Sequence, residues 1–292
     1  MKKIFWILIL SAGIIACRNN DDKADAYGNF EATEVMVSAM AQGEIFSLVI
    51  EEGQELKAGE IIGLIDTTEL FLKEEQLIKG IEAVRTRLLT IKAQMDVQIQ
   101  QKKNLVVNQK RLEKLFSDGA ATQKQVDDIN GAVDLINAQI TATSSQEQQV
   151  LAEIETMNIQ VDQVKEKLSK CYISNPVDGT VLIKYAEAGE VAAPGKPLFK
   201  IADLSLMKLK VYVSGDQLPH IKIGQKVEVQ IDKTKKENSS LGGTISWISS
   251  TAEFTPKTIQ TKEERVTLVY AVKILVPNDG SMKIGMPGEV NF

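Results

Sequence analysis

Two distant parts of the chain share one pattern of glycines, and this internal repeat limits the possible folds more than any other feature. At an offset of 136 residues, the glycines of the first part return in the second: Gly43, Gly53 and Gly59, then Gly179, Gly189 and Gly195. Apolar positions between them also correspond: Ile45 with Val181, Leu56 with Ala192, Ile62 with Leu198 and Ile65 with Ile201. Glycine permits the positive φ that tight turns between short strands require. The repeat therefore predicts two matching sets of short strands and turns.

About a hundred residues separate the two copies, and their pattern is helical. Apolar side chains recur every three or four residues, from Leu77 to Phe116 on one arm and from Val126 to Leu168 on the other. Such spacing is typical of a coiled-coil seam. Neither arm contains proline, and about 45 helical residues in each would reach roughly 65 to 70 Å. We expect an antiparallel hairpin over residues 67–170, packed more loosely where polar residues interrupt the seam: Gln98, Lys102, Thr143 and Glu147.

The turn of this hairpin has its own signals. Gly119 is suited to end the first helix, and Thr122 with Gln125 forms a capping box for the second. Arg111 and Leu115 lie one helical turn apart, so they are predicted to share a face close to Thr122.

The N-terminus is predicted to be a targeting signal. A short basic start precedes an apolar run of about twelve residues, too short for a helix that spans a bilayer. The run ends in Ile14-Ile15-Ala16-Cys17, which resembles the lipobox of bacterial lipoproteins. That resemblance implies a signal peptide over 1–17, a lipid on Cys17 and a polar tether over 18–30; the alternative is an uncleaved signal anchor. Cys171 then has no partner and is expected to be a small buried residue where helix meets strand.

The C-terminal third changes to alternating apolar and polar residues, as in Val227–Ile231 and Val266–Ile274. Turn signals separate these runs, so residues 206–292 are predicted to form a small antiparallel β-barrel or sandwich.

Composition argues against catalysis, metal binding and nucleic acid. The chain has one histidine, His220, which follows Pro219 in a predicted turn, and only two cysteines. No catalytic triad or metal centre is expected from so few ligands. A formal net charge of -5 and a pI near 5.3 disfavour a phosphate-binding surface.

The glycine repeat resembles the two halves of a biotinyl/lipoyl-like domain, here residues 31–66 and 171–205. In that fold a modified lysine lies on a tight hairpin between the halves. This chain has the long helical insertion there, which argues against a biotin or lipoate carrier and against a bound cofactor.

Arg111, Leu115 and Thr122 resemble the Arg-Leu-Ser pattern with which periplasmic adaptors meet a TolC-like outer-membrane channel, and threonine keeps the hydroxyl of serine. The alternative is that Thr122 only caps, Leu115 only packs and Arg111 is only solvated.

The segments 252–261 and Gly285–Val290, with the strand from Arg265, resemble the barrel of HlyD-type membrane-fusion proteins, most closely the YbhG-like adaptors of ABC exporters. No further membrane-proximal domain is expected after them, which also favours an ABC-type partner. The resemblance implies a non-enzymatic periplasmic adaptor, lipid-anchored to the inner membrane, that links a transporter to an outer-membrane channel as a ring of six copies. The implied fold is mixed α and β: a coiled-coil hairpin inserted between the halves of a lipoyl-like domain, then a barrel. A structural lipoprotein spacer without a transporter is the alternative.

Overall fold

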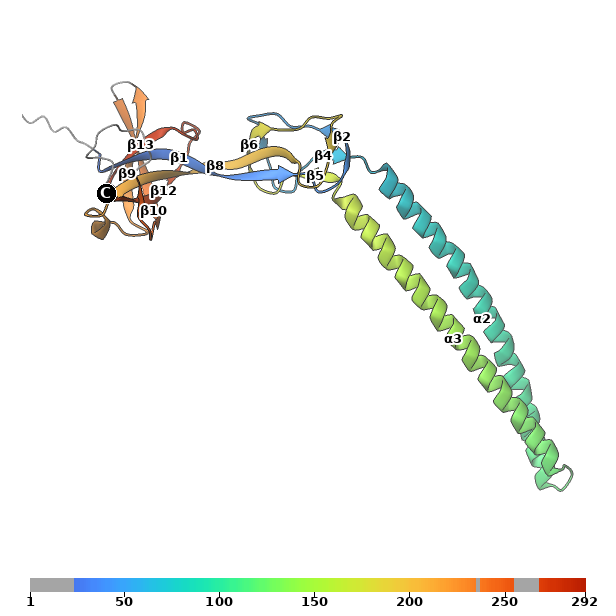
Figure 1. Cartoon of the computed structure of the whole chain (residues 1–292). Helices are drawn as coiled ribbons and strands as arrows, with labels where there is room; N and C mark the ends of the chain where they lie inside the picture. Colours follow the sequence, from blue (N-terminus) through green and yellow to red (C-terminus); the bar gives the residue numbers. More distant parts are fainter. Residues whose placement is uncertain (1–23, 235–236, 255–267) are drawn as a thin grey trace, which may run out of the picture.

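The computed structural model describes residues 24–234, 237–254 and 268–292, and it is an elongated body of strands from which a long helical hairpin projects (Figure 1). The predictions for residues 1–17, for Cys17 and for the segment 255–267 lie outside this range. Within it, neither helix of the hairpin has a stretch apolar and long enough to cross a membrane.

Both copies of the glycine repeat form short strands that build one unit next to the hairpin. We call it the repeat unit, and it contains the following elements: the end of β1 (Ala26–Ser38), β2 (Gly43–Leu48), β3 (Glu55–Leu56), β4 (Ile61–Ile65), β5 (Tyr172–Ser174), β6 (Gly179–Lys184), β7 (Val191–Ala192) and the start of β8 (Pro197–Ser214). The predicted sets of matching strands are therefore present.

The two copies interlock by exchanging strands. β2 pairs with β7 through Gly43 and Ala192, and β3 pairs with β6 through Leu56 and Gly179, which is the same contact with the copies interchanged. Single hydrogen bonds follow the same rule: the Gly53 amide donates to the Val181 carbonyl at 2.8 Å, and the Gly189 amide donates to the Ile45 carbonyl at 2.8 Å. The two copies of the sequence repeat are therefore related in space by a pseudo-twofold axis.

The repeated glycines occupy two kinds of position. Gly53 and Gly189 have φ of 87° and 89°, and Gly59 and Gly195 have φ of 81° and 89°, a region that favours glycine. Gly43 also has a positive φ, of 153°. Gly179 differs from the expected turn, because its φ is not positive and a Cβ there would lie 2.5 Å from the Ala202 carbonyl oxygen. Close strand packing, not turn geometry, requires that glycine.

The core of the repeat unit takes equivalent residues from both copies. Ile45 and Ile65 are fully buried beside Val181 and Ile201, and each such side chain stabilises the fold by about 1.5–3 kcal/mol relative to exposure. Cys171 is fully buried at the junction of helix and strand, as predicted. Its burial raises the pKa of the thiol, with a smaller contribution from the Asp66 carboxylate.

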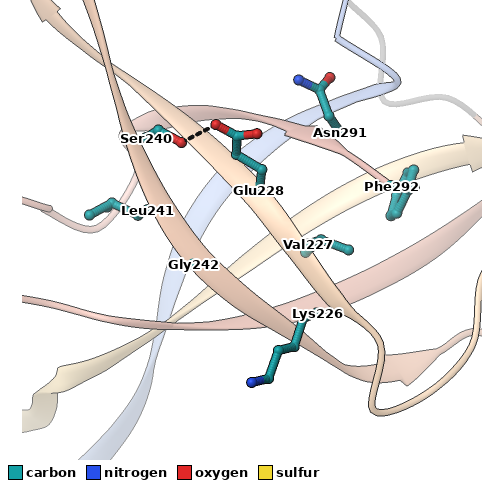
Figure 2. Close-up of a pocket in the computed structure, with 8 residues that line it drawn as sticks. All are labelled: Lys226, Val227, Glu228, Ser240, Leu241, Gly242, Asn291 and Phe292. Atoms are coloured by element: carbon teal, nitrogen blue, oxygen red, sulfur yellow. Dashed lines mark hydrogen bonds between the residues drawn. The ribbon is translucent and has the colours of Figure 1, made fainter.

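A closed β-barrel follows at the other end of the body. Its ring consists of six strands, which are, in order, β12 (Leu268–Pro277), β10 (Glu237–Ile248), β9 (Lys226–Thr234), β13 (Pro287–Asn291), β1 and β8, with β8 pairing back to β12. Phe30, Leu209 and Ile274 are buried inside. The short β11 (Glu253–Phe254) extends the edge of β12, and the 3-10 helix η1 (Leu218–His220) carries the single histidine. Because the ring of strands is closed, the fold is the predicted barrel and not the sandwich that the sequence left as an alternative. A shallow pocket lies on the outer face of β9 and β10 (Figure 2).

The N-terminal strand corrects two predicted boundaries. β1 begins at Ala26, inside the segment 18–30 predicted to be a polar tether. Ala26 and Phe30 are buried in the barrel, between β13 and β8. The barrel is therefore not confined to residues 206–292, since its ring is incomplete without this strand. Asn29 and Glu31 face outward, but the inward positions are mostly small, as at Ala26 and Gly28, so the alternation was weak in the sequence.

The hairpin consists of α2 (Thr68–Ser117) and α3 (Gln123–Ser169). With 50 and 47 residues, the helices extend about 75 and 70 Å, slightly more than expected. The predicted seam is present, and its most buried members near the base are Ile81, Val150, Ile154 and Val161.

Packing through the polar stretch of the seam is closer than predicted. Thr143 is only 3% exposed, and its hydroxyl donates to the Gln139 carbonyl of its own helix at 3.0 Å. Glu147 forms a 3.6 Å ion pair with Lys92 of the facing helix. A threonine can therefore be buried here, because a backbone carbonyl of the same helix accepts the hydrogen bond of its hydroxyl.

Candidate functional site at the hairpin tip

The tip begins with a tight helix end. The Gly119 amide donates to the Phe116 carbonyl at 3.0 Å, and the Ala120 amide donates to the Leu115 carbonyl at 2.7 Å. Gly119 has a φ of 72°. This combination is the Schellman motif, which satisfies the last carbonyls of a helix. The backbone of the turn is therefore fixed.

The second helix begins with the predicted capping box. The Thr122 hydroxyl accepts from the Gln125 amide at 3.4 Å, while the Gln125 side chain accepts from the Thr122 amide at 2.8 Å. Both bonds satisfy amides that an α-helix leaves free at its start. Only 118–122 lie between the two helices, so the tip is narrow and rigid.

The three predicted contact residues are all exposed near this tip. Arg111 and Leu115 lie one turn apart at the end of α2, and Thr122 caps α3. Leu115 is 38% exposed, and Arg111 forms no ion pair with any described residue. The guanidinium and its fixed fork of donors are therefore free to bind a carboxylate or carbonyl of another molecule.

Phe116 was assigned by its spacing to the seam, and this assignment is wrong. Its side chain is 43% exposed. The seam ends at Leu112, because α2 stops at Ser117 and the chain turns away before α3 can cover another layer. An aromatic residue in the last turn before a predicted Gly119 cap could have signalled this exposure. Phe116 and Leu115 together give the tip an apolar surface.

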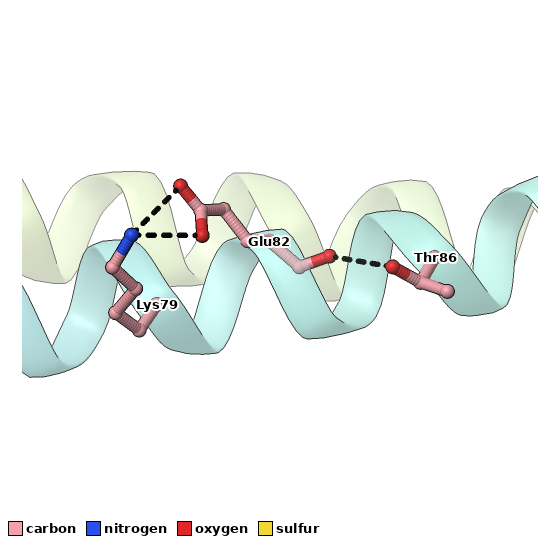
Figure 3. A network of polar contacts seen from close by, with 3 residues as sticks. All are labelled: Lys79, Glu82 and Thr86. Atoms are coloured by element: carbon pink, nitrogen blue, oxygen red, sulfur yellow. Dashed lines mark hydrogen bonds and ion pairs between the residues drawn. The ribbon is translucent and has the colours of Figure 1, made fainter.

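Polar side-chain contacts occur at several levels along the rod. Near the base of α2, Lys79 bonds Glu82 at 3.1 Å, and the Thr86 hydroxyl donates to the Glu82 carbonyl at 3.2 Å (Figure 3). Arg87 pairs with Glu153 across the two helices. Just below the tip, the Gln109 side-chain amide donates to Asn130 Oδ1 at 2.8 Å. The bonds of Arg87 and Gln109 join the two helices, whereas those of Glu82 lie within α2.

Metal-ligating side chains do not cluster among the described residues. No group of three or more histidine, cysteine, aspartate or glutamate side chains in this part of the chain could hold a metal ion. Two pKa shifts in the β body come from ion pairs: the Glu34 carboxylate accepts a hydrogen bond that raises the pKa of Lys200, and Lys196 donates one that lowers the pKa of Glu190.

Comparisons with known proteins agree with this architecture. Residues 204–261 match the family model of the LcnD-like C-terminal domain. A UPF0194 membrane protein of Yersinia pseudotuberculosis serotype O:3 (strain YPIII) is 25% identical over 300 residues, which cover 94% of this chain and 91% of that protein. The UPF0194 membrane protein YbhG of Salmonella gallinarum (strain 287/91 / NCTC 13346) is 25% identical over 330 residues, 100% of this chain and 98% of that one.

Two solved structures share the fold. MacA from Actinobacillus actinomycetemcomitans has a TM-score of 0.58 at 23% identity, covering 91% of this chain and 76% of its own. The membrane fusion protein Spr0693 from Streptococcus pneumoniae R6 has a TM-score of 0.54 at 15% identity, covering 91% of this chain and 96% of its own. The predicted resemblance to HlyD-type membrane-fusion proteins, including the YbhG-like ones, is confirmed.

Proposed function

We propose that this chain, a non-enzymatic protein of the HlyD membrane-fusion type, is the periplasmic adaptor of a tripartite efflux or secretion pump. It links an inner-membrane transporter, of ABC type, to a TolC-like outer-membrane channel. The observation that carries this proposal is the hairpin, whose helices of 50 and 47 residues end in a rigid, exposed tip. A rod of about 70 Å is far longer than packing against the repeat unit requires.

The tip supplies a contact surface of mixed chemistry. Arg111 offers a bidentate donor, Leu115 and Phe116 offer apolar area, and Thr122 offers a hydroxyl. Arginine and aromatic residues are the types that most often dominate binding energy at protein interfaces. The fixed backbone of the tip limits the entropy that docking would cost.

The arrangement of the repeat unit supports the prediction that its two copies are the halves of a lipoyl-like domain. Its two copies complete one another by strand exchange, which is the arrangement expected of paired halves. The connection from β4 to β5 is where a carrier domain would present its modified lysine, and here it is the whole hairpin. A carrier of biotin or lipoate is therefore not favoured.

The membrane end of the adaptor completes the proposal. A lipid on Cys17 holds the chain to the inner membrane on its periplasmic side, and the barrel with the repeat unit docks on the transporter. One hairpin cannot enclose a path, so several copies, six by resemblance, form a ring around a conduit.

Crosslinking in the envelope tests the proposal. We would compare tagged wild type with Arg111→Asp and with a matched control, Arg85→Asp, which reverses an exposed arginine of the same helix far from the tip. Wild type and the control are expected to recover an ABC permease and an outer-membrane channel. Arg111→Asp is expected to keep the permease and lose the channel.

Two results would contradict this account. Recovery of neither partner by wild type would favour a structural lipoprotein spacer. Equal loss of the channel in both variants would show a general effect of charge on the rod and no specific contact at the tip.

A further inference from the structure

One outer face of the barrel gathers aromatic rings and lysines. It spans four adjacent strands, β1, β8, β12 and β10, and we call it the aromatic–lysine face: Tyr27, Lys210, Tyr212, Trp247 and Lys273. Burial alternates along β8, so that Leu209 and Val211 point into the core while Lys210 and Tyr212 point out. Tyr27 is 53% exposed and Trp247 is 42% exposed.

Strand register places these side chains beside one another. Tyr27 lies opposite Tyr212, and Lys273 lies between Lys210 and Trp247 in one cross-strand row. The Lys210 amine is 5.3 Å from the centroid of the Tyr212 ring, and the Lys273 amine is 5.4 Å from that of Trp247. The rings therefore hold the ammonium groups at the surface through cation–π contacts.

The charges of this face are incompletely balanced. Lys210 has Glu253 at 3.8 Å, and the neighbouring Lys208 lies opposite Glu31. Lys273 lies directly opposite Lys210 and forms no ion pair with any described residue. Like charges directly opposite one another destabilise a strand pair. An external anion at Lys273 would relieve that repulsion.

A short stretch of chain joins the barrel that carries this face to Cys17, the predicted lipid anchor. β1 begins at Ala26, so eight residues separate Cys17 from the barrel. Eight extended residues span about 30 Å at most. This step rests on the proposed function, since it takes Cys17 to carry the lipid. A lipidated chain would keep this end of the barrel within that distance of the bilayer.

We propose that the aromatic–lysine face docks on the anionic phospholipid surface of the membrane that holds the anchor. Tyrosine and tryptophan are enriched at the membrane–water interface, and lysines are attracted to anionic headgroups. The contact can be weak, because tethering makes it intramolecular with an effective concentration on the order of millimolar. Its role is orientation: it fixes which way the barrel, and hence the hairpin, points.

Trp247 provides a direct readout, since it is the only tryptophan after Cys17. The lipidated full-length protein is reconstituted into vesicles of phosphatidylcholine alone or mixed with phosphatidylglycerol, each with a spin-labelled lipid that quenches fluorescence near the headgroups. We expect a blue shift and stronger quenching of Trp247 with phosphatidylglycerol. Lys210→Gln combined with Lys273→Gln is expected to weaken docking about thirtyfold, with fluorescence referenced to the same variant in detergent.

Lys226→Gln is the matched control, because Lys226 lies on the outer face of β9, outside the aromatic–lysine face (Figure 2). Trp247 fluorescence in this variant should be quenched as in wild type.

Equal quenching of Trp247 in both lipid compositions, or no quenching in either, overturns the proposal. Quenching or shielding that appears only when the transporter is present would make this face a protein contact and also overturns it. Mass spectrometry of the Cys17 peptide establishes the anchor separately, and a chain that recovers both pump partners without quenching refutes only the lipid contact.

Discussion

Substitutions at Thr122 can separate its capping role from a contact with the channel. Asp is as good an N-cap as threonine or better, and its charge suits the positive end of a helix. Thr122→Asp should therefore keep the tip folded while it places a carboxylate at an exposed position of the tip. Thr122→Ala removes the capping hydroxyl, and Thr122→Ser keeps both functions.

The structure limits the size of the capping effect. At 3.4 Å, the bond from the Gln125 amide to the Thr122 hydroxyl is long, although that hydroxyl also donates to Gln125 Oε1 at 3.1 Å. The reciprocal 2.8 Å bond uses the backbone amide of residue 122, which each variant retains. We therefore expect Thr122→Ala to cost about 0.5–1 kcal/mol, the lower part of the usual range for lost caps. That cost corresponds to about two- to fivefold faster hydrogen exchange of the first α3 amides.

Hydrogen exchange and channel recovery would be measured on all three variants. If Thr122 touches the channel, Thr122→Asp should keep wild-type exchange and lose the channel, while Thr122→Ser keeps both. If Thr122→Asp recovers the channel as well as wild type does, the contact is refuted and Thr122 is only a cap.

Three further predictions follow from single residues. Gly119→Ala places a side chain at a φ of 72° and should destabilise the tip by about 1 kcal/mol. Gly131→Ala lies in the interior of α3 with open space around its Cβ, and it should stabilise the helix by up to about 1 kcal/mol. If the two substitutions change the rate of hydrogen exchange in the same direction, this prediction is contradicted. The hydrogen bond from Lys196 lowers the pKa of Glu190, so NMR titration should show that carboxyl ionising below its ordinary value and Lys196→Met should raise it. Because the folded pKa is lowered, any stabilisation from Glu190 is present above the unfolded pKa of about 4.3 and is lost as pH falls through the folded value. Cys171, the only cysteine after Cys17, should react with a thiol reagent far more slowly in the native protein than in denaturant, since it is fully buried and its pKa is raised; rapid native reaction would contradict that burial.

The sequence predicted the elements whose signals are local or strictly periodic. Helical spacing identified both arms of the hairpin, because each seam residue must face the other helix along the whole rod. The capping box at Thr122 and the helix end at Gly119 were readable from a few neighbouring residues. The repeat was readable because glycine is almost the only residue that suits a φ near 90°, as at Gly53 and Gly189.

Features that depend on distant partners were missed. β1 was assigned in part to a tether because Ala26 and Phe30 find their core only when β8 and β13, far along the chain, lie on both sides. The aromatic–lysine face needs the register of four strands, which no local pattern supplies.

The pseudo-twofold axis explains why the hairpin and the barrel lie at different ends of the repeat unit. The chain enters the first copy from the barrel along β1 and leaves it toward the hairpin after β4; it enters the second copy from the hairpin along β5 and leaves toward the barrel along β8. β4 pairs with β5 through Ile61 and Ser174, and β8 pairs with β1 through Pro197 and Ser38, which are equivalent contacts of the repeat. The axis that relates the copies therefore superposes the strand pair that leads to the hairpin, β4 with β5, on the strand pair that leads to the barrel, β8 with β1. Because each pair of connections leaves the unit as one antiparallel ladder, a load between barrel and hairpin is shared by two hydrogen-bonded strand pairs, which suits a part that joins a long rod to a barrel.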